Sequence, residues 1–163
     1  MKYVNAKGLN LSSFALGTVQ LGLTYGLGEH SEKPTEEAAF EILDRAVDLG
    51  VNTLDTANNY GDSETVIGHW LTKRCKEGKE LPFTVTKIGP MKHGSYDILR
   101  DDILYQVEGC MKRLCVDKLD MLMLHIFEDY DNDRDNIRKI FADLKAQGIY
   151  DYNAISAYSH HDY

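Results

Sequence analysis

Short apolar runs alternate with longer amphipathic segments along most of the chain. Apolar residues recur at helical spacing in four segments, at about 34–50, 62–71, 96–114 and 132–148. The strand candidates between and around them are 14–18, 51–54, 82–86, 119–124 and 149–156. Strands that alternate with helices predict an α/β fold with a parallel sheet and right-handed crossovers. In such folds functional side chains lie at the carboxyl ends of the strands.

A short β-hairpin is expected before this pattern, because residues 2–5 and 9–13 flank Ala6-Lys7-Gly8. The 163 residues fit one domain, which we expect to span 1–163. The net charge of -8 disfavours nucleic acid and anionic membranes as partners. No apolar run approaches the roughly 20 residues that cross a bilayer, and the N-terminus lacks an apolar signal core. Three cysteines without CxxC spacing favour a reducing, cytoplasmic location.

Four side chains with proton chemistry lie at or just after predicted strands. Asp55 ends the run 51–54, Tyr60 follows five positions later, and Lys87 and His125 end the third and fourth runs. Taken singly, each residue type more often has a structural or surface role. Their shared position at strand ends favours one active site assembled from several elements.

Other candidate sites are weaker. Gly22, Gly26 and Gly28 do not form the GxGxxG dinucleotide fingerprint. The segment His160-His161-Asp162 has metal-ligand types, but adjacent residues rarely converge on one ion, so we expect a polar tail and no metal site. The acidic run 128–135 lacks the calcium-loop pattern, and we interpret it as a solvated or helix-capping loop.

Several motifs resemble the aldo-keto reductase family. They are LDTANNYGDSE around Asp55 and Tyr60, Val85-Thr86-Lys87, Asp120 to His125, and Ala154 to Ser159. The pattern from Leu16 to Gly22, with Tyr25-Gly26, is similar to bacterial members found near surface-sugar biosynthesis genes. The resemblance runs from about Phe14 to Ser159 and implies a (β/α)8 TIM-barrel type, here with about five strands and four helices.

The resemblance implies reduction of an aldehyde or ketone by hydride transfer from NADP(H), with NAD(H) left open. It makes Tyr60 the proton donor, Lys87 the perturbing cation, Asp55 the counter-charge and His125 the carbonyl binder. A tyrosine is a better acid at neutral pH when a nearby ammonium lowers its pKa. Cofactor contacts are implied for Gly17, Thr18, Asp55 and Ser156, and Ser156 falls on a position that binds the nicotinamide carboxamide.

Two departures from the family pattern leave alternatives open. A (β/α)8 barrel typically needs about 250 residues, and Ala154 stands where the family commonly has glycine. One alternative is therefore a catalytically inactive half-barrel that serves a structural role or forms a homo-oligomer through its open sheet edge. Another is that the sequence is part of a longer reductase.

Overall fold

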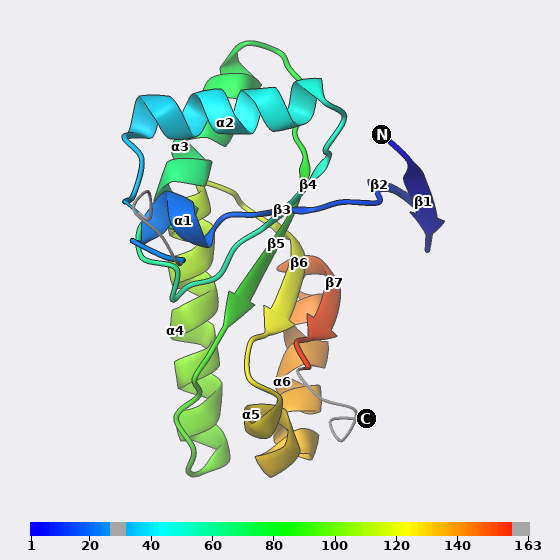
Figure 1. Cartoon of the computed structure of the whole chain (residues 1–163). Coiled ribbons are helices and arrows are strands. Elements are labelled where there is room, and N and C mark those ends of the chain that lie inside the picture. Colours follow the sequence, from blue (N-terminus) through cyan, green and yellow to red (C-terminus); the bar gives the residue numbers. More distant parts are fainter. Residues whose placement is uncertain (27–31, 158–163) are drawn as a thin grey trace.

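A computed structural model of the chain describes residues 1–26 and 32–157. Five parallel strands form one sheet whose spatial order follows chain order (Figure 1). They are β3 (Leu16–Gly17), β4 (Thr53–Asp55), β5 (Phe83–Ile88), β6 (Leu119–Leu124) and β7 (Tyr150–Ile155). Sequential parallel neighbours joined through helices are the arrangement of a (β/α) barrel. The predicted α/β fold of five barrel strands is confirmed, in the form of a half-barrel.

Six helices lie within the described residues. They are α1 (Val19–Gly22), α2 (Glu36–Asp48), α3 (Ser63–Lys76), α4 (Tyr96–Leu114), α5 (Phe127–Asn132) and α6 (Arg134–Ala146). The four helices predicted from periodicity are α2, α3, α4 and α6. The starts of α2 and α4 are fixed by side-chain caps, since Thr35 accepts a hydrogen bond from the Ala38 amide and Ser95 accepts one from the Ile98 amide.

The two faces of the sheet differ in burial. Leu54, Ile88 and Leu122 are 0% exposed and belong to the same apolar core as the inner residues of the helices. Figure 1 shows α4 alongside β5, and α6 behind β7. Successive residues of a strand point to opposite faces, so Lys87 and Met123 lie on the other face. The strands that carry Asp55, Lys87 and His125 at their ends are thus packed against the helices through this core.

The predicted N-terminal hairpin is present as β1 (Tyr3–Ala6) and β2 (Leu9–Ser12). Asn52, which directly precedes β4, attaches it to the sheet. The Asn52 Oδ1 accepts a hydrogen bond from the Ser12 amide at 2.7 Å, and its Nδ2 donates to the Asn10 carbonyl at 2.8 Å. The hairpin therefore lies at the amino ends of the strands, away from the ends that carry the candidate site.

The expectation of a buried strand over Phe14 to Thr18 was wrong in extent. Only Leu16 and Gly17 pair with β4, and the Phe14 side chain is 70% exposed. Among the described residues β3 has a neighbour on one side alone. A strand with one neighbour keeps fewer ladder hydrogen bonds and less cover, so its apolar residues are not enclosed.

The Gly22–Gly28 loop and the acidic run 128–135 also differ from expectation. Gly22 ends the short helix α1, so the loop begins one residue later. Residues 127–132 form α5, and Asp129 is only 4% exposed although it lies in an acidic run. Its carboxylate accepts a hydrogen bond from the Met91 amide at 3.1 Å, which accounts for its burial. The remaining acidic residues of the run are half-buried or exposed.

A buried ion pair connects α3 to α4. Glu64, the last residue of the LDTANNYGDSE motif, is 1% exposed and pairs with Arg113 at 2.7 Å. The Thr86 hydroxyl of β5 donates to the same carboxylate. Cys110 lies beside this pair, and burial raises the pKa of its thiol well above the usual range. Cys110 thus behaves as a packed core residue, whereas Cys75 and Cys115 are exposed.

Three sequence segments discussed above lie outside the described residues, namely Gly28, the last two residues of the motif from Ala154 to Ser159, and His160-His161-Asp162. Among the described residues no helix is both long enough and apolar enough to cross a membrane.

Candidate active site

The site centres on a buried ammonium at the carboxyl end of β5. Lys87 Nζ pairs with the Asp55 carboxylate at the end of β4 and donates a second hydrogen bond to the Thr56 carbonyl at 3.1 Å. The Lys87 side chain is 8% exposed, whereas that of Asp55 is 34% exposed. A buried charge is stable only when it is paired and hydrogen-bonded. Asp55 therefore supplies the partner that the buried ammonium needs, while the carboxylate side of the pair stays partly open.

Tyr60 and His125 complete the cluster. Lys87 Nζ lies 5.0 Å from the centre of the Tyr60 ring, within the range of a cation–π contact. The rings of Tyr60 and His125 meet edge to face, with centroids 5.6 Å apart. The structure therefore brings together all four side chains that the sequence placed at strand ends.

Hydroxyl groups hold Asp55 from inside the protein. The Thr18 hydroxyl donates to the Asp55 carbonyl at 2.8 Å, and the Thr18 amide donates to the same oxygen at 3.0 Å. Ser63 Oγ contacts Thr18 Oγ1 at 2.9 Å and Thr56 Oγ1 at 3.0 Å. These three hydroxyl residues are fully buried, so they join the ends of β3 and β4 to the start of α3.

Two glycines allow the Tyr60 loop to approach α1. A Cβ at Gly22 would lie 1.8 Å from the Tyr60 carbonyl oxygen, a contact that no side chain can make. Gly61 has φ +54, a left-handed conformation that favours glycine, and a Cβ there would lie 2.3 Å from the Gly22 carbonyl oxygen. The position of the Tyr60 backbone therefore depends on the absence of side chains at both residues.

His125 is held in its neutral form. Burial lowers its pKa below the ordinary value, the nearby Lys87 charge lowers it further, and Asp55 acts in the opposite direction. Its Nδ1 atom is buried without a hydrogen-bond partner among the described residues. A buried N–H without an acceptor is rarer than a buried acceptor without a donor. The neutral ring therefore favours the proton on Nε2, which leaves the buried Nδ1 as the acceptor without a donor.

A comparison with known families bears directly on this cluster. A model of the Aldo/keto reductase family matches residues 14–163, which include all four side chains. The chain belongs to the aldo/keto reductase family. The resemblance inferred from the motifs is thereby confirmed.

The aldo/keto reductase relatives are longer than this chain. The uncharacterised oxidoreductase YqkF of Bacillus subtilis is 33% identical over 150 residues, which are 87% of this chain and 47% of that protein. An aryl-alcohol dehydrogenase of Phanerodontia chrysosporium, named for NADP(+), is 27% identical and matches 91% of this chain and 41% of its own length. An aldo-keto reductase from Bacillus halodurans, solved in its holo form, has a TM-score of 0.71 at 26% identity, and the match covers 96% of this chain and 50% of that one. The chain thus spans about half the length of these relatives or less.

The residues expected to contact the cofactor lie around the same cluster. Gly17 pairs in register with Asp55, and an added Cβ there would meet nothing within 4 Å. Ser156 directly follows β7 and is half-buried, and its amide donates to the Leu124 carbonyl at 2.9 Å, next to His125. The Thr18 side chain instead supports Asp55 from within. In this aldo/keto reductase family member the cofactor contacts of Gly17, Thr18, Asp55 and Ser156 stay predictions.

Two polar residues beside the cluster were not singled out from the sequence. Asn58 lies in the signature between Asp55 and Tyr60, and its Nδ2 donates to Gln106 Oε1 on α4 at 2.7 Å. Gln106 is half-buried on α4, where helical spacing marks only apolar positions. The sole available signal was for Asn58, through its place in the aldo/keto reductase motif.

A cleft of about 470 Å³ lies elsewhere, between the β1–β2 hairpin and the amino ends of the strands. Its lining includes Leu9, Leu11, Phe83 and Leu119 and none of the four clustered side chains. Functional groups of barrel proteins lie at the opposite, carboxyl ends. We therefore assign the candidate site of this aldo/keto reductase family member from its side-chain chemistry and not from the position of the cleft.

Within the described residues no group of acidic, histidine and cysteine side chains is arranged to hold a metal ion.

Proposed function

We propose that this chain carries the proton-handling site of an NADP(H)-dependent carbonyl reductase that acts on an aldehyde or ketone. The observation that carries the proposal is the Lys87–Asp55 pair beneath the Tyr60 ring, with His125 edge-on to the same ring. A nicotinamide cofactor, when bound, supplies the hydride for such chemistry. The residues of the chain then need to orient the carbonyl and deliver one proton.

Tyr60 is the proton donor in this proposal. As the proton leaves the phenol, negative charge develops on its oxygen. Lys87, with Nζ 5.0 Å from the ring centre, stabilises that charge electrostatically. Asp55 holds the ammonium in place through the ion pair, and the Thr56 carbonyl fixes its direction. The proton thus moves from a residue whose neighbouring cation is already positioned.

His125 orients the substrate. Its lowered pKa keeps the ring neutral near pH 7, and the Nε2–H tautomer gives a donor for the carbonyl oxygen. Neutral imidazole avoids placing a second full charge beside Lys87. The aldehyde or ketone would accept hydrogen bonds from Tyr60 and His125 on the same oxygen.

The residues present fit one end of a nicotinamide cofactor. Ser156 lies at the end of β7 beside His125, and Gly17 lies open beside Asp55, so both can border a nicotinamide ring near the proton donor. The preference for NADP(H) is supported by the name of the Phanerodontia chrysosporium relative, an aryl-alcohol dehydrogenase of NADP(+), with NAD(H) as the competing cofactor. The three free cysteines support the accompanying proposal of a reducing, cytoplasmic location.

The test is to mix the protein with NADPH and a panel of aldehydes and ketones, and to follow the loss of NADPH absorbance. Tyr60→Phe keeps the ring that contacts Lys87 and His125 but removes the proton. We expect its turnover to fall by about 10²–10⁴, the usual contribution of a general acid. The proposal fails if the unmodified chain shows no turnover with any carbonyl, or if Tyr60→Phe turns over as fast as the parent.

A second candidate function is a catalytically inactive half-barrel that associates with itself. The observation that favours it is the open sheet, since β3 and β7 each pair with one strand among the described residues and Phe14 is 70% exposed. Open edges promote pairing with another copy. Sedimentation combined with the NADPH assay distinguishes the two proposals. An active monomer excludes the inactive half-barrel, and an inactive homo-oligomer supports it.

A further inference from the structure

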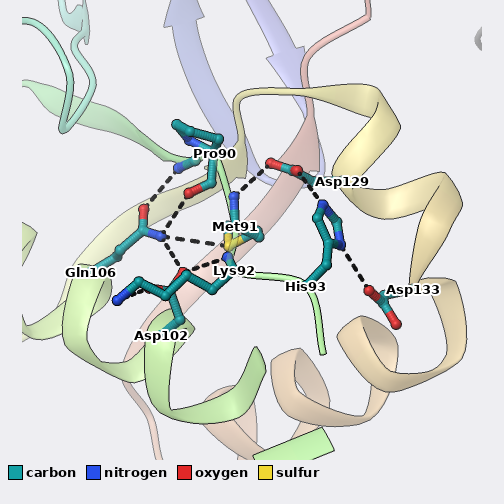
Figure 2. A network of polar contacts seen from close by, with 9 residues as sticks. Pro90, Met91, Lys92, His93, Asp102, Gln106, Asp129 and Asp133 are labelled. Carbon is teal, nitrogen blue, oxygen red and sulfur yellow. Dashed lines mark hydrogen bonds and ion pairs between the residues drawn. The ribbon is translucent and has the colours of Figure 1, made fainter. Parts of the chain in front are cut away.

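The loop between β5 and α4 (residues 89–95) leaves the end of the strand that carries Lys87. Figure 2 shows that polar side chains hold it from two directions. On one side Gln106 and Asp102 of α4 contact its main chain, and on the other Asp129 of α5 accepts from the Met91 amide. The start of this loop is therefore fixed within two residues of the candidate proton-handling lysine.

The orientation of the Gln106 amide is set by its neighbours. Its Oε1 accepts a hydrogen bond from the Gly89 amide at 2.9 Å, and a main-chain N–H can only donate. Its Nε2 donates to the Asp102 carboxylate at 2.7 Å and to the Pro90 carbonyl at 3.2 Å, both of which can only accept. The oxygen of Gln106 must therefore face Gly89.

The same oxygen also receives a hydrogen bond from the Tyr60 loop. Asn58 Nδ2 donates to Gln106 Oε1 at 2.7 Å, and the Asn58 amide donates to the Lys87 carbonyl at 2.9 Å. The Asn58 Oδ1 is buried without a partner among the described residues. Within that part of the chain, the side chain of Asn58 is thus held by Gln106 alone.

We propose that Gln106 is a positioning residue that fixes the Tyr60 loop against the end of β5. It lies outside the cluster of Asp55, Tyr60, Lys87 and His125 and acts through Asn58 and Gly89, which lie two residues from Tyr60 and Lys87 in the sequence. Its Oε1 joins the two segments in addition to the main-chain hydrogen bond from Asn58 to Lys87, and we expect the separation between proton donor and ammonium to depend on it. A catalytic role for this separation rests on the proposed reductase function, but the joining of the two segments does not.

The experiment measures amide hydrogen exchange at Asn58 by NMR in Gln106→Leu and in the control Gln147→Leu. Gln147 is an exposed glutamine at the end of α6, so it reports the effect of the same substitution away from the site. The Asn58 amide bonds to Lys87 and not to Gln106, so its exchange reports the junction of the two segments. We expect Gln106→Leu to speed it at least about threefold, as for loss of one supporting hydrogen bond, and Gln147→Leu to leave it unchanged.

Gln106→Glu gives a second variant that keeps the shape of the side chain. At neutral pH the introduced carboxylate faces that of Asp102, and like charges repel, so exchange at Asn58 should again exceed that of the parent. Near pH ~5 the introduced carboxyl group, once protonated, regains a donor toward Asp102, and exchange should approach the parent's at the same pH. This pH-dependent recovery is not expected if residue 106 merely fills space.

The inference is overturned if exchange at Asn58 matches the parent in both Gln106 variants, even when Gly89 exchanges faster. If the parent reduces carbonyls, both variants should lower kcat about tenfold with a smaller change in KM, because misplacement of reacting groups affects the chemical step. An unchanged kcat with faster exchange would overturn the catalytic part of the inference. A parent without turnover would refute the proposed function, while the exchange result would still decide whether Gln106 joins the two segments.

Discussion

Two histidines lie near the start of the β5–α4 loop, and their surroundings act on them in opposite directions. His125 is buried beside the Lys87 ammonium, and burial first and that charge second lower its pKa. His93 lies between two carboxylates, with Nδ1 2.9 Å from Asp133 and Nε2 3.2 Å from Asp129. The hydrogen bond to Asp133 is the largest effect, and it raises the pKa of His93.

The two histidines differ in the kind of buried ion that lies beside them. Beside His125 the buried ion is the Lys87 ammonium, which pairs with the Asp55 carboxylate. Beside His93 the buried ion is the Asp129 carboxylate, and its partner is a histidine whose side chain is 44% exposed. The buried ion of the candidate active site is thus paired with a carboxylate, whereas the buried ion that supports the loop is paired with a histidine.

The largest expected effect comes from removing the Lys87 ammonium. Lys87→Met should lower turnover by about 10²–10⁴, because the developing phenolate loses its cation. Lys92→Met is the matched control, since Lys92 is a 76% exposed lysine on the other side of Gly89. Steady-state kinetics with NADPH measure both variants. Equal turnover in the two would show that the position of the lysine relative to Tyr60 does not matter.

A smaller effect is expected from removing the buried carboxylate. Asp129→Ala leaves the Met91 amide buried without its acceptor and removes one partner of His93, so we expect a loss of about 2–3 kcal/mol in unfolding free energy. Asp131→Ala, at a side chain that is 60% exposed, should change it by less than about 0.5 kcal/mol. Urea denaturation measures both. A similar stability for the two variants would contradict a supporting role for Asp129.

The pH dependence of stability should differ in sign between the two histidines. His93 has a raised folded pKa, so its contribution is complete below the unfolded value of about 6.5 and is lost as pH rises through the folded value. His125 has a lowered folded pKa, so its contribution is present above about 6.5 and is lost as pH falls through the folded value. The difference in unfolding free energy between His93→Gln and the parent should therefore change with pH above about 6.5. The difference between His125→Gln and the parent should change with pH below about 6.5. Deviations on the same side would refute the comparison.

The smallest expected effect links the two regions through Lys87. Lys87→Met removes the second cause of the low pKa of His125, so that pKa should rise toward its ordinary value without reaching it, because burial remains. The pKa of His93 should not change, since its contacts are with Asp133 and Asp129. NMR titration of the imidazole protons measures both, with His125→Gln for assignment. A shift at His93 of similar size would show that the loop transmits the charge.

Much of this architecture follows from local sequence pattern. The spacing of apolar residues predicted α4 and β6 with the bounds that the structure has, and the strand ends predicted where Asp55, Lys87 and His125 lie. Such patterns are local, because side chains alternate or recur along one element. Asp129 was missed for the opposite reason: its burial depends on the Met91 amide, which is distant in the sequence. The contacts of Gln106 likewise could not be predicted from the sequence, because only the fold brings Asn58 and Gly89 next to it.

The contact between Gly22 and the Tyr60 carbonyl has a consequence for how this lineage can mutate. Every amino acid that replaces this glycine adds a side chain where there is no room. The replacement therefore displaces the tyrosine without altering any of the four clustered residues. Two descendants of this chain could therefore share an intact signature and differ in whether the tyrosine stands over its lysine. The identity of the residue at position 22 is then as informative about whether the site is intact as the identity of the residue at position 60.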